Sequence, residues 1–129
     1  MTEYLYMRET VRDKERLEHI LQALQRTKTS LDRWGKNMFM QDKTFFFGLV
    51  KNIEIIGEAT YKLTKDFKDT HTELPWAYME KMRHILVHGY YLIEEKFIWE
   101  TIESDLPAIS PIIEKYIREL TDEPKDITD

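Results

Sequence analysis

The 129-residue chain contains no cysteine and only four glycines and four prolines. Without cysteine it has no disulfide, no thiolate nucleophile and no cysteine-based zinc or iron–sulfur site. Its glycines form neither GxGxxG nor GxxxxGK[ST], which excludes a glycine-rich phosphate loop. The scarcity of glycine and proline also disfavours a turn-rich β-sandwich.

Long hydrophobic runs are absent as well. No apolar stretch approaches the roughly 18 residues of a membrane span, and the N-terminus lacks the apolar core of a signal peptide. We therefore expect one cytoplasmic domain over residues 1–129 that makes no membrane contact and needs no cofactor. Residues from about 121 to 129 are polar and acidic and are expected to form a frayed tail.

Acidic residues outnumber basic ones, 24 against 19, giving a net charge of −5. Nucleic-acid binding usually needs a basic surface, so this balance counts against it. The excess is confined to residues 94–129, which hold 11 acidic and 4 basic residues, whereas residues 1–36 hold 6 and 8. Local binding of an anion by the first two thirds of the chain remains open.

Apolar residues recur with the helical period along most of the chain, which predicts an all-α, antiparallel bundle of four to five helices. Gly57 lies in the middle of the second helix, where it costs about 1 kcal/mol relative to alanine, so we expect another helix to approach closely there. The predicted helices cover residues 3–28, 43–67, 75–88, 94–104 and 107–120, with a connection at 29–42 and a polar link at 66–73.

The histidines are the first candidates for chemistry. His19 and His71 lie among polar residues and are predicted to be solvated surface side chains. His84 and His88 are one helical turn apart, and three interpretations compete for them. They could end a helix, where a histidine suits the negative C-terminus. They could share a metal ion, although a third ligand is not evident. They could also serve phosphoester chemistry, with His88 as the base and Arg83 stabilising charge on phosphorus.

The spacing of Arg83 and His88 is awkward for a shared site. Five residues correspond to about 500°, so the two side chains are about 140° apart around an ideal helix. Two solutions remain open. Either the helix ends at His88 and frees its direction through Gly89, or the site forms across a two-fold dimer.

Four linked motifs occur in order between about residues 42 and 120, and together they resemble the HEPN-domain proteins of the HepT-like type, also called the DUF86 family. The motifs are Arg83-His-Ile-Leu-Val-His88-Gly-Tyr90 for RxxxxHxY, Asn52-Ile-Glu-Ile-Ile-Gly-Glu-Ala59 for a signature built on IGEA, Leu74-Pro-Trp76 followed by Met82-Arg83, and Phe97-Ile-Trp99 with Leu106-Pro107.

This resemblance implies a HEPN-like homodimer, with further pairing of dimers left open. It implies a metal-independent endoribonuclease toxin of a type VII-like pair that leaves a 2′,3′-cyclic phosphate on RNA. Carried over by position, Arg83 and His88 are catalytic, His84 is a supporting polar group, and Tyr90 accepts AMP from an MntA-type nucleotidyltransferase antitoxin. The alternative is a catalytically silent substrate-binding or regulatory subunit of a two-component nucleotidyltransferase. Independently of the resemblance, Glu58 is expected to have a structural role, as a partner for a cation or as a helix cap, and not a catalytic one.

Overall fold

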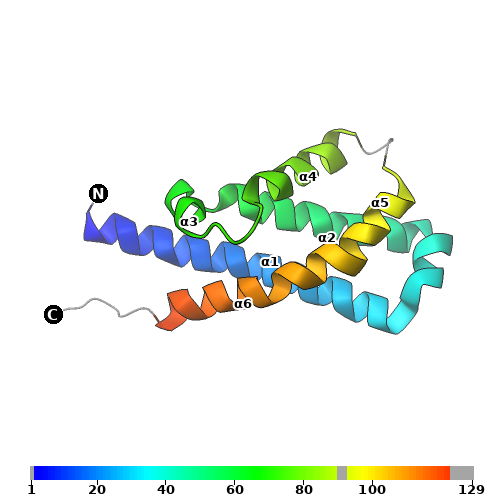
Figure 1. Ribbon diagram of the computed structural model, residues 1–129, viewed down its shortest axis with the longest axis horizontal. Helices are drawn as coiled ribbons and strands as arrows, with labels where there is room; N and C mark the ends of the chain where they lie inside the picture. Colours follow the sequence, from blue (N-terminus) through cyan, green and yellow to red (C-terminus); the bar gives the residue numbers. More distant parts are fainter. Residues whose placement is uncertain (1, 90–92, 123–129) are drawn as a thin grey trace.

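The computed structural model describes residues 2–89 and 93–122, and this part of the chain is helical and contains no strand. The prediction of an all-α fold is confirmed. The elements in Figure 1 are α1 (Glu3–Gln41), α2 (Lys43–Lys62), α3 (Lys65–Thr70), α4 (Trp76–His88), α5 (Glu95–Glu100), the π-helical turn η2 (Thr101–Asp105) and α6 (Leu106–Asp122).

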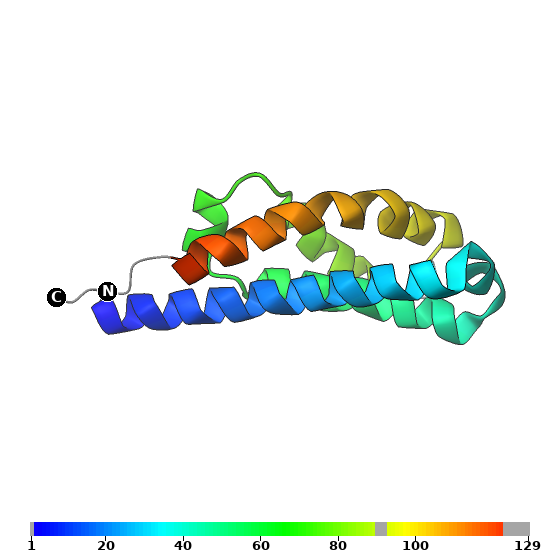
Figure 2. The same cartoon turned by 90° about the horizontal axis from the view of Figure 1, so that it is seen from below.

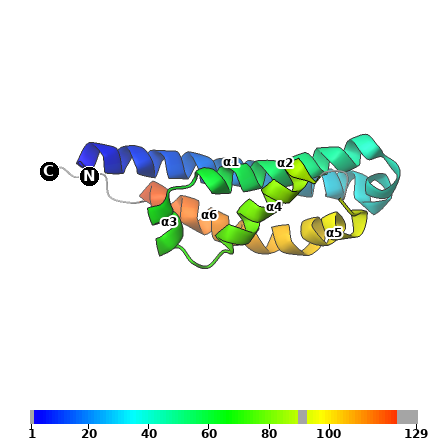
Figure 3. The ribbon, with the colours of Figure 1, turned by 90° about the horizontal axis from the view of Figure 1, so that it is seen from above.

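The four long helices run up and down in an antiparallel arrangement. The hairpin of α1 and α2 forms the long axis of the molecule, α4 packs on α2, and α6 packs on α1. Figure 2 shows α6 lying along α1. Figure 3 shows α1 and α2 along one edge and the α5–η2–α6 segment on the opposite side. One long face of the α1–α2 hairpin is therefore left to solvent.

Helix α2 is the centre of the core, as its periodicity predicts. Phe46, Leu49, Ile53 and Ile56 are buried at steps of three and four, and burying each such side chain contributes about 1.5–3 kcal/mol. The other helices contribute buried apolar residues to the same core, namely Leu17, Ile20, Ala23 and Leu24 from α1, Met79, Met82 and Leu86 from α4, and Ile113 and Tyr116 from α6.

The predicted connection at residues 29–42 is wrong. Helix α1 continues to Gln41, and its one non-helical residue is Gly35, with a φ of 74°. Beyond this kink, buried Phe39 packs its ring 5.2 Å from the rings of Phe46 and Trp99. The chain therefore bends at Gly35, within the predicted connection, but is helical on both sides of the bend.

The second helix ends earlier than predicted, at Lys62, and the expected polar link contains α3. Buried Asp13 of α1 explains the break. Its carboxylate accepts hydrogen bonds from the Thr64 backbone N–H at 2.9 Å and the Thr64 hydroxyl at 2.7 Å. The same hydroxyl accepts a hydrogen bond from the Phe67 N–H and so caps α3.

The last two predicted helices follow each other without a break. Glu100, Thr101 and Leu106 all have helical backbone angles, and η2 joins α5 to α6. Helix α6 includes residues 121 and 122 of the predicted tail, while residues 123–129 lie outside the described residues. No helix in the described ranges is both long and apolar enough to cross a membrane.

Candidate active site

Helix α4 begins and ends where the sequence predicts. Pro75 precedes it, and Gly89 follows His88 and donates its N–H to the Ile85 carbonyl at 2.8 Å. The last two turns of α4 therefore carry Arg83, His84 and His88.

Gly57 of α2 lies directly against Arg83, which confirms the predicted close approach. A Cβ atom at position 57 would collide with the Cβ of Arg83 and would lie 3.0 Å from the Met79 carbonyl oxygen. Only glycine lets the two helix backbones come this near. The glycine therefore sets the distance between α2 and the base of the arginine side chain.

The next residue, Glu58, pairs with the same arginine. Its Oε1 lies 2.9 Å from the Arg83 Nε, and its Oε2 lies 3.7 Å from the Lys62 Nζ. Oε1 is shielded from solvent, but the Nε–H is not aligned with it as in a hydrogen bond. Both side chains are more than a third exposed, so the pair contributes at most about 1 kcal/mol to stability. Its main effect is to orient the guanidinium, and the expected structural role of Glu58 as the partner of a cation is confirmed.

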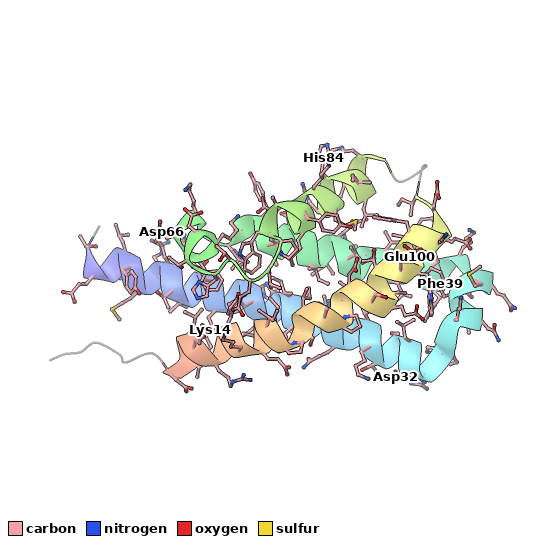
Figure 4. The ribbon with its side chains drawn as sticks, viewed as in Figure 1. Lys14, Asp32, Phe39, Asp66, His84 and Glu100 are labelled. Carbon is pink, nitrogen blue, oxygen red and sulfur yellow. The ribbon has the colours of Figure 1, made fainter. Side chains whose placement is uncertain are left out.

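His84 and His88 lie on a different face of α4 from Arg83. Both are exposed, and their ring centroids are 4.6 Å apart at an interplanar angle of 49°. In Figure 4 the side chain of His84 points away from the bundle. Because His88 is the last helical residue, its direction is still set by the helix, about 140° from Arg83. One protomer does not bring the two predicted catalytic residues together.

Tyr90, the predicted acceptor of AMP, lies outside the described residues. Across residues 2–89 and 93–122, no three histidine, aspartate or glutamate side chains come together in a way that could hold a metal ion.

Arg83 opens into a pocket of about 300 Å³ that spans the outer side of α2 from α4 to α1. Arg16 and His19 of α1 line it together with Lys51 and Lys62 of α2. His19 is exposed, as predicted, and its side chain also lines this pocket. The prediction that His71 is a solvated surface residue is wrong, because its side chain is half-buried and its ring stacks on the buried ring of Phe67 at a centroid distance of 3.9 Å.

The sequence did not identify this basic pocket. Arg16 and His19 are three residues apart and share a helix face, but nothing in the sequence says that this face meets the outer side of α2. The order of the helices around the core supplies that information.

Comparison with known proteins bears directly on this site. A family model described as Ribonuclease HepT-like matches residues 20–116. The "Probable ribonuclease HepT" of Thermococcus cleftensis is 33% identical over 102 residues, covering 79% of this chain and 93% of that protein. The "Putative RNase TTE0752" of Caldanaerobacter subterraneus is 33% identical over 109 residues, covering 84% and 94%. No solved structure matches at a significant level. The chain belongs to the HepT-like ribonuclease family, and its Arg83–His88 helix lies within the matched region.

Proposed function

We propose that the chain is a metal-independent endoribonuclease whose active site combines Arg83 of one protomer with His88 of a second copy in a homodimer. Family membership supports the ribonuclease activity. The observation that supports the dimer is the placement of Arg83 and His88 about 140° apart around α4, so that the two side chains leave the helix in different directions within one protomer.

The outer face of α4 fits a second copy of the chain. Ile85 and Val87 are 43% and 39% exposed, and both lie in the last turn of α4, between His84 and His88. Exposed apolar side chains on one helix face are typical of an interface. Two copies packed about a two-fold axis along this face would bring both pairs of motif residues into one cleft.

The proposed reaction needs only the groups that this cleft would hold. His88 takes the proton from the 2′-hydroxyl, and the 2′-oxygen attacks phosphorus and forms the cyclic ester. The bond from phosphorus to the 5′-oxygen breaks, and a protonated histidine of the dimer gives that oxygen its proton. Arg83 donates to the phosphate oxygens as their charge grows. His84, beside His88, is a supporting polar group in this scheme.

Regulation by a nucleotidyltransferase belongs to the same proposal. Tyr90 follows His88 by two residues. Its hydroxyl would lose its proton and attack the α-phosphorus of ATP, pyrophosphate would leave, and the AMP on the tyrosine would fill the cleft and place a phosphodiester beside an Arg83 of the dimer. Such a group would exclude RNA by volume and by charge. An MntA-type nucleotidyltransferase would act as the antitoxin of this toxin, both in the cytoplasm.

The test is complementation between two inactive variants, assayed for RNA cleavage in EDTA. Arg83→Ala and His88→Ala are each expected to lose activity as pure proteins. Subunit exchange forms mixed dimers in which one of the two sites regains an intact arginine and an intact histidine from different protomers. Activity of the mixture above that of either variant supports a site shared between protomers, whereas activity no higher than in the pure variants contradicts it.

Two controls separate the parts of the proposal. Ile85→Glu places a charge on the outer face of α4 and is expected to give inactive monomers by light scattering. If wild type, folded and dimeric, does not cleave RNA, the nuclease proposal fails and the silent nucleotidyltransferase subunit is the better interpretation.

The modification is tested by measuring the intact mass of the protein after incubation with the nucleotidyltransferase and ATP. Tyr90→Phe is expected to abolish the gain of AMP.

A further inference from the structure

A second pocket, of about 550 Å³, lies in the seam between α1 and α2. Gln22, Gln25, Thr29 and Ser30 of α1 line one wall. Each of these side chains can both donate and accept hydrogen bonds. The wall is therefore polar, and Arg26 is the one charged residue that lines this pocket.

The opposite wall is formed by α2 and contains a gap. Gly48 lines the pocket, and a Cβ atom built on it would meet nothing within 4 Å. Phe45 presents a half-buried ring beside this gap, and Arg26 Nε donates a hydrogen bond to Asn52 Oδ1 at 3.2 Å across the seam. An aromatic ring and a positioned guanidinium thus accompany the hydrogen-bonding groups.

The two pockets adjoin each other. His19 of the first pocket and Gln22 of the second are one turn apart on α1, and Lys51 and Gly48 are one turn apart on α2. From residue 16 to residue 30 the combined surface extends about 21 Å along α1. We call this surface, lined by both pockets, the α1–α2 groove.

The α1–α2 groove is basic although the chain as a whole is acidic. Glu54 and Glu58 are its carboxylates, and they pair with Lys51, Lys62 and Arg83 at 2.9–3.7 Å. Arg16 and His19 contact no carboxylate in the described part of the chain. The cationic residues that line the groove are Arg16, Arg26, Lys51, Lys62 and Arg83.

We propose that the α1–α2 groove binds single-stranded RNA along the stretch of the strand that extends from the cleaved bond at Arg83. The basic pocket would hold the phosphates next to the cleaved bond. The polar pocket would receive one or more bases, which stack on Phe45 and hydrogen-bond to the α1 wall. Duplex RNA is too wide for a seam between two packed helices. This inference rests on the proposed function, and it names the class of substrate and the surface that selects it.

Gly48→Leu is the decisive variant because it fills the groove without disturbing the core. Binding of a short fluorescein-labelled single-stranded RNA is measured by anisotropy in the His88→Ala background, so that the RNA stays intact. Gly48→Leu is expected to weaken binding about tenfold or more, whereas Ser104→Leu, an exposed position on η2, is expected to leave it unchanged. Urea unfolding checks that both variants remain folded.

Salt dependence provides the second measurement. Removing one phosphate contact lowers the slope of log K against log salt by about 0.7 for a single strand. Arg16→Ala and Lys51→Ala are each expected to show that change. Arg118→Ala, an exposed arginine on α6 away from the groove, is expected to show none.

The outcomes distinguish this proposal from the one on which it rests. If wild type cleaves RNA and Gly48→Leu binds and cleaves like wild type, the groove is not the RNA path, and the ribonuclease assignment is unaffected. If RNA binds with the expected dependence on Gly48 and Arg16 but wild type does not cleave it, the groove is supported and the nuclease fails. If a duplex of the same sequence binds as tightly as the single strand, the proposed selectivity is wrong.

Discussion

Two glycines of helix α2 should respond in opposite directions to the same substitution. Gly48 and Gly57 both lie inside the helix, where replacing glycine by alanine removes about 1 kcal/mol of conformational cost. At Gly48 an added Cβ meets nothing within 4 Å, so Gly48→Ala should raise the unfolding free energy by about 0.5–1 kcal/mol.

At Gly57 the same gain is opposed by a steric cost. The new methyl group would collide with the Arg83 Cβ and stand 3.0 Å from the Met79 carbonyl, and both neighbours are parts of α4 that cannot rotate away. Overpacking of this kind costs typically 1–3 kcal/mol. The net effect of Gly57→Ala should be a loss of about 0–2 kcal/mol. The unfolding free energies of the two variants should therefore differ by about 0.5–3 kcal/mol.

The assay is urea unfolding of both variants at one protein concentration, because dimer formation would make stability concentration-dependent. RNA cleavage is measured in parallel, and Gly57→Ala is expected to lose activity, because moving α4 outward displaces the arginine from its partner Glu58. Gly48→Ala should remain folded, with a higher unfolding free energy than wild type. Equal stabilisation by both substitutions would refute the reasoning that Gly57 sets the distance between α2 and α4.

Three further substitutions test other contacts. Asp13→Ala should lower the unfolding free energy by about 2–3 kcal/mol, measured in urea, because it removes both hydrogen bonds from Thr64 to a buried carboxylate; an unchanged midpoint would contradict this role. Burial and a hydrogen bond to Glu73 raise the pKa of Tyr116 to about 12. The neutral phenol therefore stabilises the fold by about 2–3 kcal/mol below pH 10, and this contribution is lost as the pH rises towards 12. Tyr116→Phe should therefore show a smaller fall in thermal stability between pH 10 and 12, and an identical fall would count against the assigned cause. Arg83→Lys keeps the charge but loses the planar fork, so RNA cleavage in EDTA should fall about 100-fold, and a rate equal to wild type would show that a point charge is sufficient.

The helices that periodicity predicted best are those whose ends carry local signals. Helix α4 begins after Pro75 and ends before Gly89, and both boundaries follow from the backbone properties of proline and glycine. The break after Lys62 has no such signal. It depends on Asp13, which is 51 residues away from Thr64 in the sequence and meets it only in the folded bundle.

In the candidate site, too, some features follow from the sequence and others depend on the folded structure. The angle between Arg83 and His88 follows from helical geometry. The sequence left open whether the helix end frees His88, and the structure shows that His88 is still helical. The residues that surround Arg83 can be identified only from the tertiary structure. Glu58 becomes the partner of Arg83 because Gly57 lets α4 approach, and Arg16 enters the same pocket because α1 packs beside α2.

The net charge of −5 predicts repulsion of RNA at long range, but it does not govern binding inside the α1–α2 groove. The acidic excess lies in residues 94–129, and the described part of this segment lies on the opposite side of the bundle from α1 and α2 in Figure 3. At physiological ionic strength charges are screened beyond about 8 Å, so a phosphate in the groove responds mainly to the local cations. At about 0.01 M salt the screening length rises to about 30 Å, and the acidic side then opposes binding. A plot of log K against log salt should therefore flatten at low salt. This flattening separates a groove built into an acidic protein from a uniformly basic surface, for which the line stays straight.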